Sequence, residues 1–143
     1  MFFTLFSSKN HKLVLEWTKE HKEIVFLATR VISEYSSGNY VAAKIELINL
    51  QKLAIHHLMT EDLEFYDILH DEKGVDKEVE KYILNFQKSF QDVKPTLMQF
   101  LTKYIQDDEI LDEVFFFNFK ELVATLAKRI EYEEKNLYKK LDN

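Results

Sequence analysis

The chain has 143 residues, no cysteine and a formal net charge of −6 at pH 7. Its length suits a single domain, residues 1–143, with a core of its own. The lack of cysteine excludes disulfides, thiolate metal sites and cysteine nucleophiles, and it predicts a location in the reducing cytoplasm. The negative charge, with no cluster of Lys and Arg, argues against a nucleic-acid partner.

The first six residues, Met1-Phe2-Phe3-Thr4-Leu5-Phe6, are apolar but too few to cross a bilayer. They also lack the basic flank of a signal peptide. We therefore expect a soluble protein with no membrane partner. Their apolar side chains are expected to close one end of the fold, or to dock onto another subunit.

Helix-breaking sequences occur at Ser36-Ser37-Gly38-Asn39, Asp71-Glu72-Lys73-Gly74 and Gln106-Asp107-Asp108. They divide the chain into four segments of roughly 25 to 35 residues with helical spacing of apolar residues. Two glycines and one proline leave little turn chemistry for a sheet. The sequence predicts an all-α protein, an up-down-up-down four-helix bundle.

The helix ends can also be predicted. Gly38 suits the left-handed residue that follows a helix, and Asn39 suits the N-cap of the next one. Asp76 and Asp108 are the expected N-caps of the third and fourth helices. Pro95 lies inside the third segment, so that helix should kink or break at the residue before it.

Each segment has a stripe of residues at steps of three and four, the spacing of an inward helix face. The stripes are Leu13, Trp17, His21, Ile24, Ala28, Val31 and Tyr35; Ala43, Leu47, Leu50, Ala54, His57, Glu61, Phe65 and Ile68; Val79, Ile83, Phe86, Phe90, Val93, Leu97, Phe100 and Tyr104; and Phe115, Phe119, Leu122, Leu126, Arg129, Glu133, Leu137 and Leu141.

Polar residues interrupt three of these stripes: His21 in the first, His57 and Glu61 in the second, and Arg129 and Glu133 in the fourth. Polar groups in a core need a metal, a counter-charge or a hydrogen-bond network. In an up-down-up-down bundle the second and fourth helices run in the same direction, which places their polar residues at similar heights. We therefore expect these residues to converge.

The run His57-Leu58-Met59-Thr60-Glu61-Asp62, followed by Phe65-Tyr66, resembles the second-helix signature of hemerythrin-like (HHE cation-binding) domains. Glu20-His21 resembles the ligand position of the first helix, and residues 127–138 resemble the last-helix motif. The resemblance extends from about Leu13 to Leu141. It implies a di-iron or related metal site used for oxygen binding, oxygen or redox sensing, or iron handling.

The chain also departs from that family. Its third segment has no histidine, and Arg129 stands where the last helix should present one. The matching candidates for metal ligands are His21, His57, Glu61 and Glu133. Because two bridged metals need about five to seven protein ligands and one ion needs three or four, a complete oxygen-carrying di-iron centre is not expected.

Three interpretations of the polar residues remain open. The His and Glu set binds a metal ion, with iron as the candidate cofactor and O₂ as a candidate ligand. Alternatively, Arg129 pairs with Glu61 and Glu133 and replaces the metal, in a metal-free regulatory or interaction protein. In the third interpretation the side chains only extend into solvent at one end of the bundle. None of the three is an enzyme.

Phe115-Phe116-Phe117 with Phe119 is too apolar for a single stripe. Dense core packing beneath the connection between the first two helices is one explanation. The other is an exposed patch for a protein partner or a homodimer. The acidic run Glu131, Glu133 and Glu134 is expected to be mostly a solvated helix face.

Overall fold

The computed structural model describes residues 2–142, and the side chains of residues 9–142. The side chains of Phe2, Phe3, Leu5 and Phe6 lie outside this range. The described chain is helical, as expected, and contains no strand. Its elements are α1 (Phe2–Ser36), α2 (Tyr40–Leu69), α3 (Lys77–Ser89), α4 (Val93–Tyr104), α5 (Glu113–Tyr132), the π-helical turn η1 (Glu133–Leu137) and α6 (Tyr138–Asp142).

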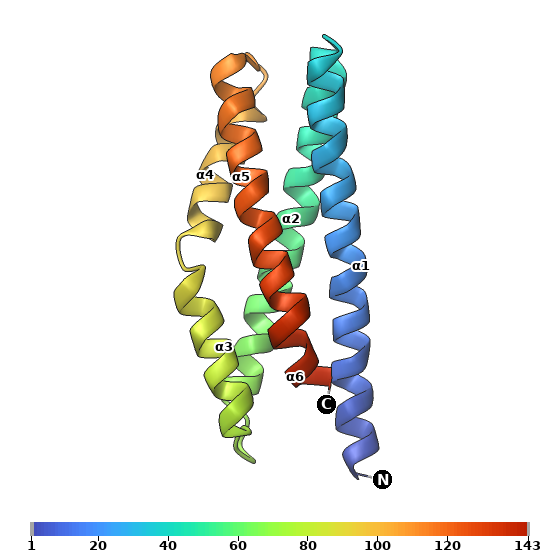
Figure 1. Cartoon of the computed structure of the whole chain (residues 1–143), viewed down its shortest axis with the longest axis vertical. Coiled ribbons are helices and arrows are strands. Elements are labelled where there is room, and N and C mark those ends of the chain that lie inside the picture. Colours follow the sequence, from blue (N-terminus) through green and yellow to red (C-terminus); the bar gives the residue numbers. More distant parts are fainter. Residues whose placement is uncertain (1, 143) are drawn as a thin grey trace.

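The helices form an elongated bundle (Figure 1). α1 packs along α2, its immediate successor, and α3 and α4 follow one another along the opposite side of the molecule. α5, η1 and α6 return from the connection after α4 and contact α1, α3 and α4. Among the described residues, no helix combines the length and the apolar character needed to cross a membrane.

The connection between α1 and α2 follows the prediction. Gly38 has φ +80°, and the N–H groups of Gly38 and Asn39 donate to the carbonyls of Tyr35 and Glu34. These two bonds make the Schellman motif, which ends a helix at a left-handed glycine. Asn39 precedes α2, but its side chain donates to Glu34 and does not cap α2.

Of the other two expected N-caps, one is confirmed and one is wrong. The Asp76 carboxylate accepts from the N–H groups of Glu78 and Val79 at the start of α3. α5 begins at Glu113, and its cap is Asp112, which accepts from Phe115; Asp108 lies in the preceding loop. The helix starts after Leu111, a loop residue that is itself buried in the core, and the Asp112 carboxylate supplies the cap directly before Glu113.

The third segment is two helices, with the break at residues 90–92, slightly before the predicted position. Pro95 is the third residue of α4. The first four N–H groups of a helix have no partner within it, so a proline in this turn costs no hydrogen bond. The helix therefore breaks shortly before Pro95, so that the proline lies in the first turn of α4, where its missing N–H is not needed.

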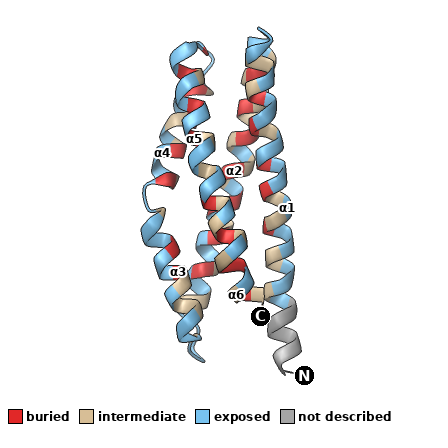
Figure 2. Ribbon diagram, viewed as in Figure 1, coloured by how far each residue is buried: buried red, intermediate tan, exposed pale blue. Residues whose placement is uncertain are grey.

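The interior contains two apolar clusters with a polar layer between them. One cluster is centred on Leu47, Leu101 and Phe115, and the other on Trp17 and Phe86. The stripes predicted from the sequence form the inner faces, where Figure 2 shows the buried residues. The buried polar residues, which belong to neither cluster, are His21, His57, Glu61, Arg129 and Glu133.

The phenylalanine run supports the packing explanation for three of its four rings. Phe115 and Phe119 are buried in the core, and Phe116 stacks on Tyr35, next to the connection between α1 and α2. Phe117 is 61% exposed.

Candidate metal centre

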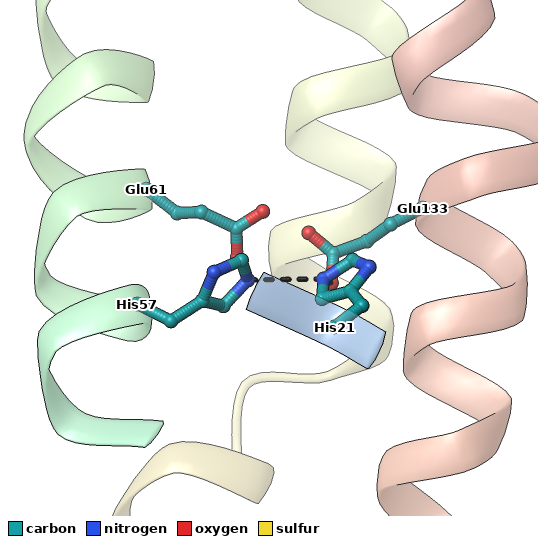
Figure 3. A group of neighbouring side chains, drawn as sticks. All are labelled: His21, His57, Glu61 and Glu133. Atoms are coloured by element: carbon teal, nitrogen blue, oxygen red, sulfur yellow. Dashed lines mark hydrogen bonds and ion pairs between the residues drawn. The ribbon is translucent and has the colours of Figure 1, made fainter. Parts of the chain in front are cut away.

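Four side chains from three elements converge in the polar layer: His21 from α1, His57 and Glu61 from α2, and Glu133 from η1. Each residue offers one nitrogen or oxygen atom to this point, and these four atoms all lie within 4.8 Å of one another. Figure 3 shows the two imidazoles and the two carboxylates pointing at one another. All four residues are at most 3% exposed, so the interpretation in which they extend into solvent is wrong.

Both imidazoles turn the same ring atom inward. The Nε2 atoms of His21 and His57 are 3.0 Å apart (Figure 3), and His57 Nε2 is 3.2 Å from Glu61 Oε1. The spacing of four residues between His57 and Glu61 places both on one face of α2. This face brings a nitrogen lone pair and a carboxylate oxygen to the same point.

The outward nitrogens are held by two further carboxylates. His57 Nδ1 is 2.7 Å from Glu20 on α1, and His21 Nδ1 is 2.9 Å from Glu134 on η1. A carboxylate on Nδ1 selects the tautomer with a hydrogen there, which leaves Nε2 free to bind a metal. Each bond also joins two elements, so the ring orientations are fixed by the packing of the bundle.

Tyr138, from the apolar cluster around Trp17, reaches the polar layer with its hydroxyl. Its hydroxyl donates to Glu61 Oε2 at 2.6 Å, and it lies 3.1 Å from Glu133 Oε2 and 3.3 Å from His21 Nε2. Tyr138 is five residues after Glu133, and in an α-helix the two would face different directions. In the π-helical turn the N–H of Tyr138 bonds to the carbonyl of Glu133, which brings both residues to one face.

Arg129 supplies a positive charge beside the two carboxylates. Its Nη2 is 3.6 Å from Glu61 Oε1, and its Nε is 3.6 Å from Glu133 Oε1. The guanidinium carbon lies 4.8 Å from the centre of the Phe86 ring, and the residue is 6% exposed. The separations are those of ion pairs and exceed ordinary hydrogen-bond lengths.

The carboxylates have opposite pKa shifts. Burial raises the pKa of Glu61, but Glu133, His57 and the Tyr138 hydroxyl outweigh it and lower that pKa to about 2. Burial and the negative charge of Glu61 raise the pKa of Glu133 well above its usual value. Two carboxyls so close oppose each other's ionisation, although Arg129 partly offsets this for Glu133. Glu133 therefore holds a proton more strongly than Glu61 does.

The histidines differ in the same way. Burial and the neighbouring His57 lower the pKa of His21. Burial also acts against the charge on His57, but its bonds to Glu61 and Glu20 outweigh it and raise the pKa. Of the two rings, His57 is thus the one that holds a second proton more strongly.

One atom of the layer has no well-directed hydrogen bond. Among the described residues, Glu61 Oε1 is buried and accepts none, although the cationic groups of His57 and Arg129 are near it. An unsatisfied buried carboxylate oxygen is costly, and a cation would satisfy it. Two imidazoles and two carboxylates are also a normal ligand set for Zn²⁺ or iron. The residues present therefore fit a single metal ion.

Sequence reasoning brought together the right five residues but missed three of their partners. Glu20 is adjacent in sequence to His21, and Glu134 to Glu133, and these neighbouring acids were the available signal. Of the acidic run expected to be mostly solvated, Glu131 and Glu134 are 60% and 37% exposed, but Glu133 is buried. Tyr138 had no such signal, since the π-helical turn breaks the spacing of three and four.

Comparisons with protein-family models, curated proteins and solved structures found no match to this chain.

Proposed function

We propose that this protein binds one metal ion in the core of the bundle, through His21, His57, Glu61 and Glu133. The observation that carries the proposal is the orientation of the two imidazoles, both with Nε2 inward and with Nδ1 bound to an outer carboxylate. That arrangement is typical of metal-binding histidines. The ion would join α1, α2 and η1, and the burial of all four residues supports a binding or sensing role more than turnover of a substrate.

We further propose that the bundle is a divergent hemerythrin-like domain. Counting α3 with α4 and α5 with η1 and α6 gives four rods with alternating directions, the architecture the resemblance implies. The converging residues are those matched to the family motif. On this proposal iron is the first metal to test, and a response to oxygen or to redox state is the first function to test.

The test is metal content. Protein purified without chelator should contain about one ion of iron, zinc or manganese per chain, because four ligands suit a single ion. His57→Ala should remove it. His70→Ala is the matched control, since His70 is an exposed histidine at the end of the same helix. Wild-type protein with far less than one ion per chain, even after incubation with each metal, would contradict the proposal.

A second candidate is the metal-free protein in which Arg129 replaces the ion. The observation that favours it is the position of the guanidinium, 3.6 Å from an oxygen of each carboxylate. In that case a chelator should leave the melting temperature unchanged, and Arg129→His should create or strengthen metal affinity. A fall in melting temperature on chelation would count against this candidate.

A further inference from the structure

Three polar atoms of the candidate metal centre surround the Tyr138 hydroxyl. Glu61 Oε2, Glu133 Oε2 and His21 Nε2 all lie within 3.3 Å of it. A phenol has one hydrogen to donate, so it serves only one of the three fully. The Tyr138 hydroxyl oxygen thus lies next to three of the four candidate metal ligands.

The ring is held firmly in this place. It stacks on the His21 ring, with a distance of 5.5 Å between the ring centroids and an interplanar angle of 10°. The centroid of the Trp17 ring lies 5.6 Å from that of Tyr138. Tyr138 is 2% exposed. The π-helical turn fixes its direction relative to Glu133. A rigid, preorganised oxygen at this point costs little further ordering when an ion binds.

The charges indicate which ion would use this oxygen. The Glu61 and Glu133 carboxylates are anionic ligands and the two imidazoles are neutral ones, while Arg129, 3.6 Å from both carboxylates, offsets one of the two negative charges. A phenolate would add one negative charge, which offsets the one charge by which Fe³⁺ exceeds a divalent ion. Hard anionic oxygens also favour a trivalent ion of this kind over the softer Zn²⁺.

Tyr138 and Glu134 also line a depression on the surface of the bundle. A surface depression of about 210 Å³ is lined by Val14, Thr18, Glu134, Tyr138, Lys139 and Asp142. Glu134, which holds His21, is therefore both part of the centre and accessible from outside.

We propose that Tyr138 is a fifth ligand, and that it makes this centre a ferric site with a phenolate bond to the metal. The proposal rests on the metal-binding function proposed above. As the Fe–O bond forms, the phenol O–H bond breaks and its proton passes to solvent; no electron is transferred. With a divalent ion such as Zn²⁺, Tyr138 stays neutral and remains a donor to Glu61.

The experiment titrates the metal-free protein with ferric nitrilotriacetate and follows the visible spectrum, because phenolate-to-Fe³⁺ charge transfer gives a strong visible band. Wild-type protein should develop the band and saturate near one ion per chain. Tyr138→Phe keeps the ring and removes only the oxygen, so the band should be lost and Fe³⁺ affinity should fall by at least about 10-fold. The same variant should still bind about one Zn²⁺ ion per chain, measured by calorimetry, because His21, His57, Glu61 and Glu133 are all retained.

Tyr132→Phe is the matched control. Tyr132 lies on α5 and packs against Phe86 and Phe90, outside the polar layer, so its variant should keep the full band. Fe³⁺ binding without a visible band, or equal Fe³⁺ affinity in wild type and Tyr138→Phe, would overturn the ligand role while leaving the metal site intact. Failure of wild-type protein to bind either Fe³⁺ or Zn²⁺ would overturn both proposals.

Discussion

At the scale of single residues, Glu134 determines how His21 faces the centre. Its carboxylate bonds to His21 Nδ1 at 2.9 Å, and its side chain is 37% exposed. Replacing a carboxylate that orients a metal-binding histidine typically lowers metal affinity 10–100-fold. We predict a loss of about this size for Glu134→Ala, measured by competition with a chelator of known affinity.

Glu131→Ala is the control for this prediction. Glu131 lies at the end of α5, just before η1, and pairs with Lys135 at the surface, where its side chain is 60% exposed. Its replacement should leave metal affinity unchanged. Equal affinities for Glu134→Ala and Glu131→Ala would show that His21 needs no carboxylate to hold its orientation.

Arg129 matters most when no ion is present. Its guanidinium is then the fixed cation between Glu61 and Glu133. Removing one member of a buried ionic cluster leaves an uncompensated charge and costs about 3–5 kcal/mol. We expect Arg129→Met to lower the free energy of unfolding of the metal-free protein by this amount, measured by urea denaturation with chelator present.

The surface residue Arg30 provides the comparison. It pairs with Glu34 and Glu46, and its side chain is 47% exposed. Exposed pairs contribute about 0–1 kcal/mol, so Arg30→Met should change little. If the two variants unfold alike, the Arg129 ion pairs are not a significant source of stability.

At the scale of secondary structure, the spacing of the apolar residues predicted which face of each helix points inward. It did not predict where the helices are interrupted. His57 and Glu61 lie four residues apart on an unbroken helix, so their common direction follows from sequence alone. Tyr138 is inward only because η1 inserts a π-helical turn, and that turn is coupled to packing of Leu137, Tyr138 and Leu141 against Trp17 and Phe86. Such packing depends on tertiary structure, which no local pattern reveals.

The helix ends, too, include some that local sequence determines and one that depends on tertiary packing. Gly38 and Asp76 act through their own backbone or side-chain chemistry, and both positions were predicted. The start of α5 depends on Leu111 filling a space in the core. A loop residue of this kind looks like part of the helix in the sequence, which is why Asp108 appeared to be the cap.

Lys44 joins α2 to the end of α4. Its Nζ donates to the carbonyls of Tyr104, Gln106 and Glu109, at 2.6–2.7 Å. The last carbonyls of a helix lack partners within it, and a cation there also complements the helix dipole. Hydrogen bonds from a charged group contribute about 1.5–3 kcal/mol, so we predict that Lys44→Met destabilises the protein by about that much in thermal or chemical unfolding.

Lys52→Met is the control, because Lys52 is exposed on the same helix. Lys44→Met should also speed amide hydrogen exchange at the end of α4, since fewer groups hold that turn closed. Equal stability of the two variants would mean that water replaces the ammonium group without loss.

At the scale of the whole molecule, the proposed metal binding would be linked to protonation of the same side chains. The pKa values of His57 and Glu133 are raised, so both hold their protons more strongly in the metal-free fold than an isolated side chain does. A metal ion needs the lone pair of His57 and the anionic form of Glu133, and it must displace both protons. Because the pKa of His21 is lowered, metal binding to this ring should release no proton near neutral pH.

The sign of the pH dependence follows from this competition. Below the raised pKa values protons occupy the ligand atoms and weaken binding, so Zn²⁺ affinity should rise with pH and level off once both groups are deprotonated. Calorimetry in buffers of different ionisation enthalpy should detect about two protons released per Zn²⁺ where both groups are protonated. Fe³⁺ should release one more, from Tyr138, and that extra proton should be absent in Tyr138→Phe. A Zn²⁺ affinity that does not depend on pH between 5 and 8, a range in which histidine normally changes charge, would show that the ion binds elsewhere on the chain.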